Sequence, residues 1–413
     1  MRVLVVGGGG REHALVWKLA CSERVREVHA CPGNPGIAQL ADCHPVSAQD
    51  LPGILNLAEE LRPDLVVVGP EVPLVAGVVD RLEAAGIPAF GPSAAAARLE
   101  GSKAFARELT QRHGIPGPRH CSFQGAAQAE EFIRARAWAR VVKADGLAAG
   151  KGVVVAEDAE EACRAARRLL EEHGGRVVVE ERLTGREVSV LAFTDGHEVS
   201  VLEPARDHKR VFDADRGPNT GGMGAFSPVP DCPAATVARI EEEILRPTVR
   251  AMEQEGCPFR GVLYAGIMLT EQGPRVLEFN ARFGDPEAQA LLPRLQTDLV
   301  EVAEAVRTGG VGRLRLAWDL RAAVTVVAAA AGYPGSYAQG LPIRGLEQVA
   351  QLPDVLVFHA GTADGPAGPV TAGGRVLAVT ALAPDLAAAA ARAYVALAHI
   401  EFPGMHYRHD IGN

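Results

Sequence analysis

Residues 277–287 (LEFNARFGDPE) place oxygen ligands and a guanidinium close together. Val276, Glu278 and Asn280 alternate along a predicted strand, so Glu278 and Asn280 are expected to project from one face of it. A carboxylate beside an amide oxygen suits a hard cation such as Mg²⁺, which often keeps phosphate oxygens in its shell. Arg282 adds a planar fork of donors that can hold a carboxylate or a phosphate. We therefore predict a metal site at Glu278 and Asn280 rather than an edge strand with a polar outer face.

A glycine-rich segment at 143–152 (KADGLAAGKG) lies between two predicted strands. It is one residue too short for the phosphate-binding motif G-x-x-x-x-G-K, and Gly152 stands where that motif has the Ser or Thr that holds Mg²⁺. We predict a flexible glycine hairpin over a triphosphate, with Lys151 and backbone N–H groups on the phosphates and Lys143 reaching in from the strand. A surface hairpin with two solvated lysines is the alternative.

An apolar run at 177–181 ends in two acids, and Glu187 follows six residues after Glu181. The main-chain edge after this strand could read an adenine, and the Glu187 carboxylate could accept both ribose hydroxyls. Taken alone, these residues fit an ordinary acidic surface better.

The segment 206–230 is polar, rich in glycine and without hydrophobic periodicity, which predicts a long loop. A loop of this length inside a compact domain is more often functional than not. Its stretches DHKR (207–210) and PNTGGMGA (218–225) combine charged groups with glycines that allow close backbone approach. We predict an active-site segment, because Met223 and Phe226 argue against disorder.

The composition is that of an ordinary globular protein of 413 residues, 47% hydrophobic and 23% charged. A net charge of −9 without a basic run argues against a nucleic-acid surface. Seven scattered cysteines without a C-x-x-C pair favour a reducing cytoplasm over a disulfide framework or a zinc site. We expect neither a secretory leader nor a membrane span, because a strand follows Met1 directly and no apolar run approaches ~20 residues.

The first hundred residues alternate short apolar strands with helical patterns, which predicts a doubly wound parallel sheet. Strands are expected at 3–6, 25–30, 65–69 and 88–90, and helices at 12–19, 51–60, 74–85 and 94–99. Such sheets bind ligands beyond the carboxyl ends of their strands. Four loops rich in glycine and proline lie there, at 7–10, 32–36, 69–73 and 91–93.

The first of these loops (GGGG) opens a helix, a position that favours anions at backbone N–H groups. The dinucleotide motif G-x-G-x-x-G fails, because its sixth position is Glu12 and no acid follows the second strand. NAD binding is therefore disfavoured. Phosphate or small-substrate binding and a purely structural turn remain as alternatives.

The rest of the chain is divided less regularly. A helix is expected at 102–113, followed by a compact unit at 119–186 with helices 126–135 and 160–173. Further strands are expected at 187–193, 198–204, 261–270 and 274–280, and further helices at 235–255 and 287–307. A final unit from about 322 has expected strands at 323–330 and 375–381 and a helix at 386–398.

Together these motifs resemble the glycinamide ribonucleotide synthetases of the ATP-grasp superfamily. The matching stretches span essentially the whole chain and are VVGGGGREHA, PGNPG, VGPEVPLVAG, FGPS, LEGSKAF, KADGLAAGKGVVVA, VVVEERLTG, DHKRVFDADRGPNTGGMGA, GVLYAGIM, LEFNARFGDPEAQ, YPGSY and HAGT. The DHKR…GPNTGGMGA and FN-x-RFGDPE stretches are highly specific for this family.

The resemblance implies a multidomain α/β and α+β fold and a step of purine biosynthesis. ATP, glycine and 5-phospho-β-ribosylamine would give ADP, phosphate and glycinamide ribonucleotide, with Mg²⁺ or Mn²⁺ as the cation. The expected partners are these small molecules, without nucleic acid or membrane, and the expected state is a cytoplasmic monomer or weak dimer. The implied parts are an N-terminal substrate-binding domain (1–101), an ATP-grasp A part (102–118 and 187–312), a B lid (119–186) and a C-terminal domain (321–413).

The resemblance also assigns roles to individual residues. The implied metal ligands are Glu278 and Asn280. The implied ATP-binding residues are Lys103, Lys143, Gly146, Gly150, Lys151, Gly152, Glu180, Glu181, Leu183 and Glu187. The residues implied at the reacting groups are Arg282, Asp207, Lys209 and Asn219. The loops at the strand ends supply the expected substrate-binding residues Gly9, Gly10, Asn34, Pro70, Glu71 and Ser93.

The chain departs from the family pattern in several places. Gly8 stands where Asn is usual, the lid is short at 173–175, Arg186 replaces a common acid, and residues 262–269 offer no second metal-binding acid. Another ATP-grasp ligase or carboxylase is one alternative, and it would respond to bicarbonate rather than glycine. A nucleotide-binding regulatory protein without turnover is the other, and the intact set of Glu278, Asn280 and Arg282 argues against it.

Overall fold

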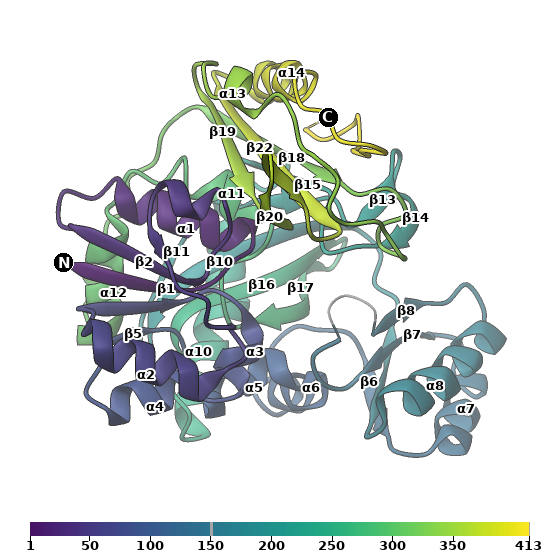
Figure 1. Ribbon diagram of the computed structural model, residues 1–413. Coiled ribbons are helices and arrows are strands. Elements are labelled where there is room, and N and C mark those ends of the chain that lie inside the picture. The colour runs from purple at the N-terminus through teal and green to yellow at the C-terminus, as the bar shows by residue number, and fades with distance from the viewer. Residues whose placement is uncertain (149–151, 413) are drawn as a thin grey trace.

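The computed structural model describes residues 1–148 and 152–412 as a multidomain α/β protein, the class that the sequence predicts. Its N-terminal part is built on a parallel sheet with the strand order β3-β2-β1-β4-β5 (Figure 1). These strands are β1 (Arg2–Gly7), β2 (Glu27–Pro32), β3 (Asp42–Cys43), β4 (Leu65–Val68) and β5 (Ala89–Phe90). Residues 3–6 and 65–68 are buried, as expected for a parallel sheet covered on both faces.

Five helices accompany this sheet: α1 (Gly10–Ala20), α2 (Leu51–Leu61), α3 (Glu71–Val75), α4 (Val78–Ala84) and α5 (Ala94–Gly101). A short 3-10 turn (Ile37–Gln39) follows the loop at the end of β2. The prediction of one helix at 74–85 is wrong, because Gly77 takes a left-handed conformation (φ +84°) that separates α3 from α4.

Helix α6 (Lys103–Arg112) leads into a separate unit with an antiparallel sheet in the order β6-β9-β7-β8. Its strands are β6 (His120–Phe123), β7 (Ala139–Ala144), β8 (Val153–Val155) and β9 (Val177–Glu181), and its helices are α7 (Ala126–Arg134) and α8 (Ala159–His173). The unit has its own hydrophobic core and stands at the lower right of Figure 1, apart from the N-terminal sheet. We call it the lid unit, and its role as a lid with the bounds 119–186 stays a prediction.

The central antiparallel sheet has the order β11-β10-β16-β17. Its strands are β10 (Arg186–Asp195), β11 (Val199–Val201), β16 (Arg260–Thr270) and β17 (Gly273–Asn280). The predicted helix 235–255 is α9 (Ala234–Ile240) and α10 (Arg246–Gln254) joined by a π-helical turn (Glu241–Leu245). The predicted helix 287–307 is wrong as one element: it divides into α11 (Glu287–Leu291) and α12 (Leu299–Thr308), and Asp298 caps the second.

A β-bulge in β17 corrects the predicted alternation along that strand. Gly266 of β16 pairs with Glu278 while the next residue, Ile267, pairs with Val276, which leaves Leu277 as the extra residue. Val276 is fully buried in the core and lies on the opposite face from Glu278 and Asn280, so it does not alternate with them as predicted. The bulge frees the Leu277 carbonyl for side-chain donors from other elements.

The C-terminal sheet has the order β12-β15-β18-β22-β19 and takes two strands from the segment predicted as an aperiodic loop. Its strands are β12 (Arg206–Asp207), β15 (Gly224–Ser227), β18 (Ala322–Ala329), β19 (Val355–His359) and β22 (Arg375–Ala383). Two hairpins, β13 (Arg210–Phe212) with β14 (Arg216–Asn219) and β20 (Thr362–Gly365) with β21 (Gly368–Thr371), lie beside it. A 3-10 turn (Val311–Arg313) precedes β18, and the remaining helices are α13 (Leu346–Val349) and α14 (Leu386–Leu397).

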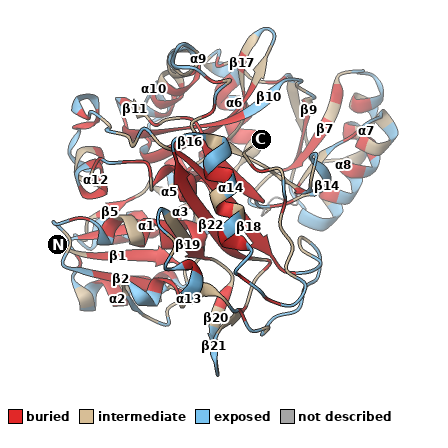
Figure 2. Cartoon of the chain, turned by 90° about the horizontal axis from the view of Figure 1, so that it is seen from above, coloured by how far each residue is buried: buried red, intermediate tan, exposed pale blue. Residues whose placement is uncertain are grey.

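The prediction of a structureless loop at 206–230 is therefore wrong, because its strands of two to four residues are too short to show alternation in the sequence. This sheet also crosses the predicted boundary between the A part and the C-terminal domain. Figure 2 shows buried residues following the sheets and exposed residues on the outer helices. The seven cysteines are free thiols, and within residues 1–148 and 152–412 no helix is long and apolar enough to cross a membrane.

Candidate active site

A polar cavity of about 980 Å³ lies where the N-terminal part, the lid unit and the two antiparallel sheets meet. It brings together side chains that are up to 364 positions apart, because Arg11 and Arg375 both line it. The predicted site residues along its walls are Glu71, Lys103, Lys143, Gly146, Gly152, Glu180, Glu181, Leu183, Glu187, Asp207, Lys209, Asn219, Glu278, Asn280 and Arg282. Gly150 and Lys151 lie outside the described residues.

Glu278 is the carboxylate around which the cations of the cavity gather. Lys209 Nζ lies 3.6 Å from Glu278 Oε1 and 2.9 Å from Glu187 Oε2. Burial would raise the pKa of Glu278, but Lys209, Lys143 and other nearby cations outweigh it and lower that pKa below its ordinary value. Glu278 is therefore ionised at neutral pH and available to a cation.

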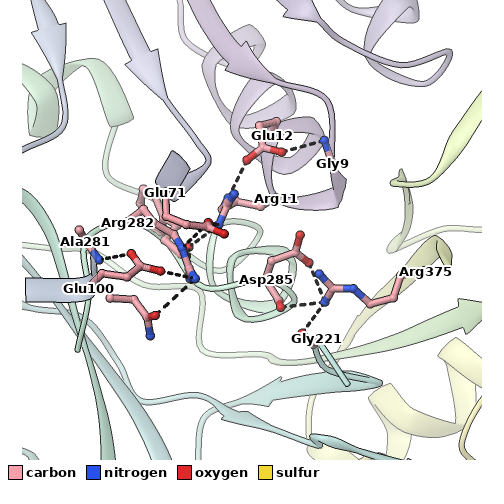
Figure 3. Close-up of polar contacts among 12 residues, drawn as sticks. Gly9, Arg11, Glu12, Glu71, Glu100, Gly221, Ala281, Arg282, Asp285 and Arg375 are labelled. Atoms are coloured by element: carbon pink, nitrogen blue, oxygen red, sulfur yellow. Dashed lines mark hydrogen bonds and ion pairs between the residues drawn. The ribbon is translucent and has the colours of Figure 1, made fainter. Parts of the chain in front are cut away.

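Arg282 is held in place by two carboxylates from the N-terminal part. Its Nε lies 3.2 Å from Glu71 Oε2 and its Nη2 lies 2.7 Å from Glu100 Oε1. Figure 3 shows both carboxylates facing the guanidinium. A longer contact of 3.4 Å joins Nη2 to Asn280 Oδ1. Glu100 also accepts a hydrogen bond from the Ala281 backbone N–H at 2.7 Å, so the segment after β17 is fixed from two sides.

The lid unit is joined to the rest of the site by a buried ion cluster. Glu180 Oε1 accepts from Arg107 Nε at 2.7 Å, and Glu180 Oε2 lies 2.9 Å from Lys143 Nζ. Burial opposes ionisation, but Arg107 and Lys143 lower the pKa of Glu180 to about 2. Both cations also donate to the Leu277 carbonyl freed by the β-bulge, at 2.5 and 2.9 Å. The Glu180 side chain is thus occupied internally.

The start of α6 touches the glycine loop of the lid unit. Lys103 Nζ donates to the Gly146 carbonyl at 2.7 Å, and Asp145 Oδ1 accepts from Ser102 Oγ at 2.9 Å. Burial lowers the pKa of Lys103. Gly152 lies so close to Ala148 that an added Cβ would be 2.6 Å from the Ala148 Cβ, so a side chain there would push against the loop.

A buried carboxylate that sequence reasoning did not single out stands at the start of α11. Glu287 Oε1 accepts hydrogen bonds from Tyr264 of β16 at 2.9 Å and from Ser189 of β10 at 3.0 Å. Glu287 is 3% exposed, and among the described residues no cationic side chain lies within 4.0 Å of it. The only sequence signal was its place at the end of the specific FGDPE stretch.

Arg375 of β22 was also missed, and it contributes the C-terminal wall of the cavity. It donates to the carbonyls of Gly221 at 2.6 Å and Asp285 at 2.8 Å, and its Nη1 lies 3.3 Å from Asp285 Oδ1 (Figure 3). Asp285 also accepts from Gln289 at 2.8 Å. No local pattern marks Arg375, since its partners lie 90 or more positions away.

The predicted substrate-binding residues of the N-terminal loops, apart from Glu71, sit outside the cavity lining. The Gly9 N–H donates to Glu12 Oε2 at 2.7 Å, Gly10 begins α1, Pro70 precedes α3 and Ser93 caps α5. The Asn34 side chain makes four hydrogen bonds of 2.9 Å to backbone groups, which fixes the loop 32–36 against His359. A role for these residues in substrate binding stays a prediction.

Comparisons with known proteins identify the family to which the chain belongs. Residues 1–100 match the phosphoribosylglycinamide synthetase N domain, residues 101–288 its ATP-grasp (A) domain and residues 323–413 its C domain. A phosphoribosylamine–glycine ligase of Streptomyces coelicolor is 51% identical, with 100% of this chain and 98% of that protein covered. The chain belongs to the phosphoribosylglycinamide synthetase family. It is an ATP-grasp ligase of purine biosynthesis, and such ligases generally use ATP and divalent metal ions.

Solved structures agree with this family. The phosphoribosylamine–glycine ligase of Thermotoga maritima has a TM-score of 0.86 and 33% identity, with 99% of this chain and 100% of that chain covered. A biotin carboxylase of Campylobacter jejuni shares the fold at 16% identity and a TM-score of 0.75, covering 98% of this chain and 92% of that chain. The chain also matches 42% of the trifunctional purine biosynthetic protein adenosine-3 of Gallus gallus at 50% identity.

The ionisation of Asp207 is expected to make the free energy of unfolding of the protein depend on pH. Burial, with Glu287, Glu187 and Glu278 adding to it and Lys209 opposing it, raises the pKa of Asp207 from 3.8 to about 7. Between pH ~4 and ~7 the folded protein therefore binds more protons at this group than the unfolded chain, so this contribution to stability is lost as pH rises. Asp207→Asn should raise the Tm of the metal-free and nucleotide-free protein relative to wild type at pH 8 more than at pH 5, by roughly 2–4 °C per kcal/mol.

The control is Asp364→Asn, which changes an exposed acid on the β20–β21 hairpin. Because this residue does not line the cavity, the control shows what removal of a remote carboxylate does to the Tm at each pH. An Asp207→Asn variant whose Tm difference does not grow between pH 5 and pH 8 would contradict the raised pKa.

Proposed function

We propose that this cavity joins glycine to 5-phospho-β-ribosylamine through glycyl phosphate. The observation that carries the proposal is the ionised Glu278, set beside Asn280 and Arg282 and faced by lysines from three other elements. A carboxylate oxygen of glycine attacks the γ-phosphorus, and the bond to the β-phosphate oxygen breaks to release ADP. The amine of phosphoribosylamine then attacks the carbonyl carbon, phosphate leaves with the bridging oxygen, and the amine loses a proton.

The nucleotide end of the cavity is proposed at the lid unit. Lys103 and Lys143 stand where they can neutralise phosphate charge, and Lys143 is held by Glu180 at 2.9 Å. Beyond Glu181 the main chain leaves the sheet and lines the cavity at Leu183, which suits recognition of a base edge. Glu187 lies beyond it, with Lys209 2.9 Å away, and we propose that its carboxylate accepts the ribose hydroxyls.

The residues present fit a divalent cation, which we propose to be Mg²⁺ or Mn²⁺. Glu278 and Asn280 offer a carboxylate and an amide oxygen. The 3.4 Å hydrogen bond from Arg282 to Asn280 is weak, so a cation could replace it at the amide oxygen. Within the described residues no group of three or more His, Cys, Asp or Glu side chains could hold a metal, so phosphate oxygens and water would complete the shell. The cation would supply charge neutralisation on the transferring phosphoryl group.

The chain's own residues do the remaining work by position and charge. Arg282, braced by Glu71 and Glu100, is proposed to hold the anionic group of glycine or glycyl phosphate. Lys209 is proposed to neutralise charge between the ribose carboxylate and the metal carboxylate. Asp207 and Asn219 are proposed to contact the reacting groups from the β12–β15 side.

Glu287 is proposed to receive the ammonium group of glycine. Its carboxylate is oriented by two hydroxyl groups, lines the same cavity as Arg282 and lacks a cationic partner within 4.0 Å among the described residues. A zwitterion would satisfy both groups, with its carboxylate toward Arg282 and its ammonium toward Glu287. A buried carboxylate without such a partner is costly, which favours a cationic ligand group here.

Two broader proposals complete the assignment. We propose a cytoplasmic protein, supported by seven free thiols that suit a reducing compartment. We also propose a monomer or weak dimer acting on small molecules.

Oxygen transfer tests the proposed intermediate. With glycine carrying ¹⁸O in both carboxylate positions, one labelled oxygen should appear in each inorganic phosphate and one should stay in the amide carbonyl. Mass spectrometry of the phosphate measures this directly. Unlabelled phosphate formed together with product would exclude glycyl phosphate.

Loss of charge at the proposed metal ligand is a second test. Glu278→Gln should cut turnover by more than ~10², because one metal-held charge carries several kcal/mol of transition-state stabilisation. The matched control is Glu243→Gln on the outer π-helical turn, which should turn over like wild type. Near-normal turnover of Glu278→Gln at saturating cation would remove Glu278 from the site.

The ammonium site can be tested through glycine affinity. Glu287→Gln should raise the KM for glycine by about 10–100-fold, because a hydrogen bond to a charged group is worth about 1.5–3 kcal/mol. The KM for ATP should change little. Tyr264→Phe, which removes one donor but keeps the carboxylate, should have a smaller effect, and a larger effect of Tyr264→Phe than of Glu287→Gln would contradict the role.

A further inference from the structure

After α14 the chain reaches the β13–β14 hairpin, and we call residues 406–411 (HYRHDI) the tail. The tail is fixed to the C-terminal sheet, because His406 and Ala329 exchange backbone hydrogen bonds of 2.9 and 2.7 Å. Tyr394 of α14 holds it further on: its hydroxyl donates to the Arg408 carbonyl at 3.0 Å and accepts from the Ile411 N–H at 2.9 Å. The tail is thus a rigid part of the C-terminal unit.

The tail makes hydrogen bonds to the β13–β14 hairpin from its first strand to its turn. At the far turn, Asp410 Oδ2 accepts from the Ala214 N–H at 2.8 Å and Asp213 Oδ1 accepts from the His409 N–H at 2.8 Å. Midway, His406 Nε2 donates to the Val211 carbonyl at 2.8 Å. In Figure 1 the yellow C-terminal end lies next to this hairpin, at the upper right.

Arg408 connects these contacts and is 1% exposed. Its Nε and Nη2 each lie 2.7 Å from an oxygen of Asp410, and its Nη1 lies 2.7 Å from Asp215 Oδ1. The same Nη1 donates to the Arg210 carbonyl at 3.1 Å. A buried guanidinium with this many directed bonds fixes the geometry of its partners, because its donors lie in one plane.

The hairpin in turn carries residues of the cavity at its base. Arg210 pairs with Asn219, and Lys209 directly precedes Arg210. Thr220 locks the base, since its N–H and its hydroxyl both donate to the Lys209 carbonyl, at 2.7 and 2.9 Å. The carbonyl that Arg408 holds is therefore one residue from the lysine that reaches Glu278 and Glu187.

We propose that the tail is a clamp that sets Lys209 and Asn219 in the cavity, with Arg408 as its positioning residue. Arg408 does not line the cavity and acts through the hairpin alone. The inference rests on the proposed function, because Lys209 and Asn219 are placed in that site. It gives the tail a part in phosphoryl transfer although none of residues 406–411 lines the cavity.

The test compares Arg408→Gln, Arg408→Lys and Asp213→Asn with wild type. The control is Arg392→Gln, an arginine of α14 that bonds Asp354 at 2.9 Å and the Leu382 carbonyl at 2.7 Å away from the hairpin. Turnover and each KM are measured well below the Tm and divided by the folded fraction. Hydrogen exchange at residues 208–224 is measured in the same proteins without substrates.

Arg408→Gln should lower turnover per folded molecule by about 10–100-fold, since small misplacements of charged groups have effects of this size. It should also speed exchange at residues 208–224, while the KM for glycine changes little. Arg408→Lys should recover part of the loss, and Asp213→Asn, which alters only a half-exposed hairpin residue, should show a smaller loss of the same kind. Arg392→Gln should match wild type.

Arg408→Gln and Asp213→Asn proteins with wild-type turnover per folded molecule and unchanged exchange would overturn the clamp. An equal loss of turnover in Arg392→Gln would show that the effect of Arg408→Gln is a general loss of stability, and this would also overturn the clamp. Wild-type protein that makes no ligation product would instead overturn the proposed function, and the exchange measurement would still report whether the tail holds the hairpin.

Discussion

The site depends on keeping one carboxylate, Glu278, ionised in a partly buried position. Burial alone would raise its pKa, and lysines from separate parts of the chain reverse that effect. Lys209 comes from the segment between β12 and β13, Lys143 from the lid unit and Lys103 from α6. The charge balance is therefore complete only when all these parts are assembled, which ties the chemistry of the cavity to the arrangement of the whole molecule.

Ion pairs and hydrogen bonds from the surrounding structure hold the cationic side chains of the cavity in place. Arg107 and Glu180 fix Lys143 against the Leu277 carbonyl, which the bulge in β17 exposes. Glu71 and Glu100 hold Arg282, so its guanidinium stays 3.4 Å from Asn280 Oδ1, and no ion pair joins it to Glu278 within the described residues. Phosphoryl transfer needs this fixed arrangement of charge more than it needs a nucleophile, because positioning and electrostatic stabilisation dominate the catalysis.

Much of this could be predicted from local spacing. The parallel N-terminal sheet followed from short apolar strands, and Glu278, Asn280 and Arg282 followed from three positions in one short stretch. The bulge at Leu277 could not be predicted, because it depends on how β16 pairs with β17. Glu287 and Arg375 were missed since their partners are distant in sequence, and the strands within 206–230 were missed because each is too short to alternate. Substrate binding by Asn34 stays a prediction, while the four hydrogen bonds of its side chain to backbone groups could not be read from the sequence.

The most direct test of the central claim is phosphate release with Mg-ATP, glycine and phosphoribosylamine formed in situ from ribose 5-phosphate and ammonia, omitting each component in turn. The account predicts release only when all are present, together with a product of the mass of glycinamide ribonucleotide. Release without glycine, or release that depends on bicarbonate instead, would contradict it and would assign the same fold to another ATP-grasp reaction.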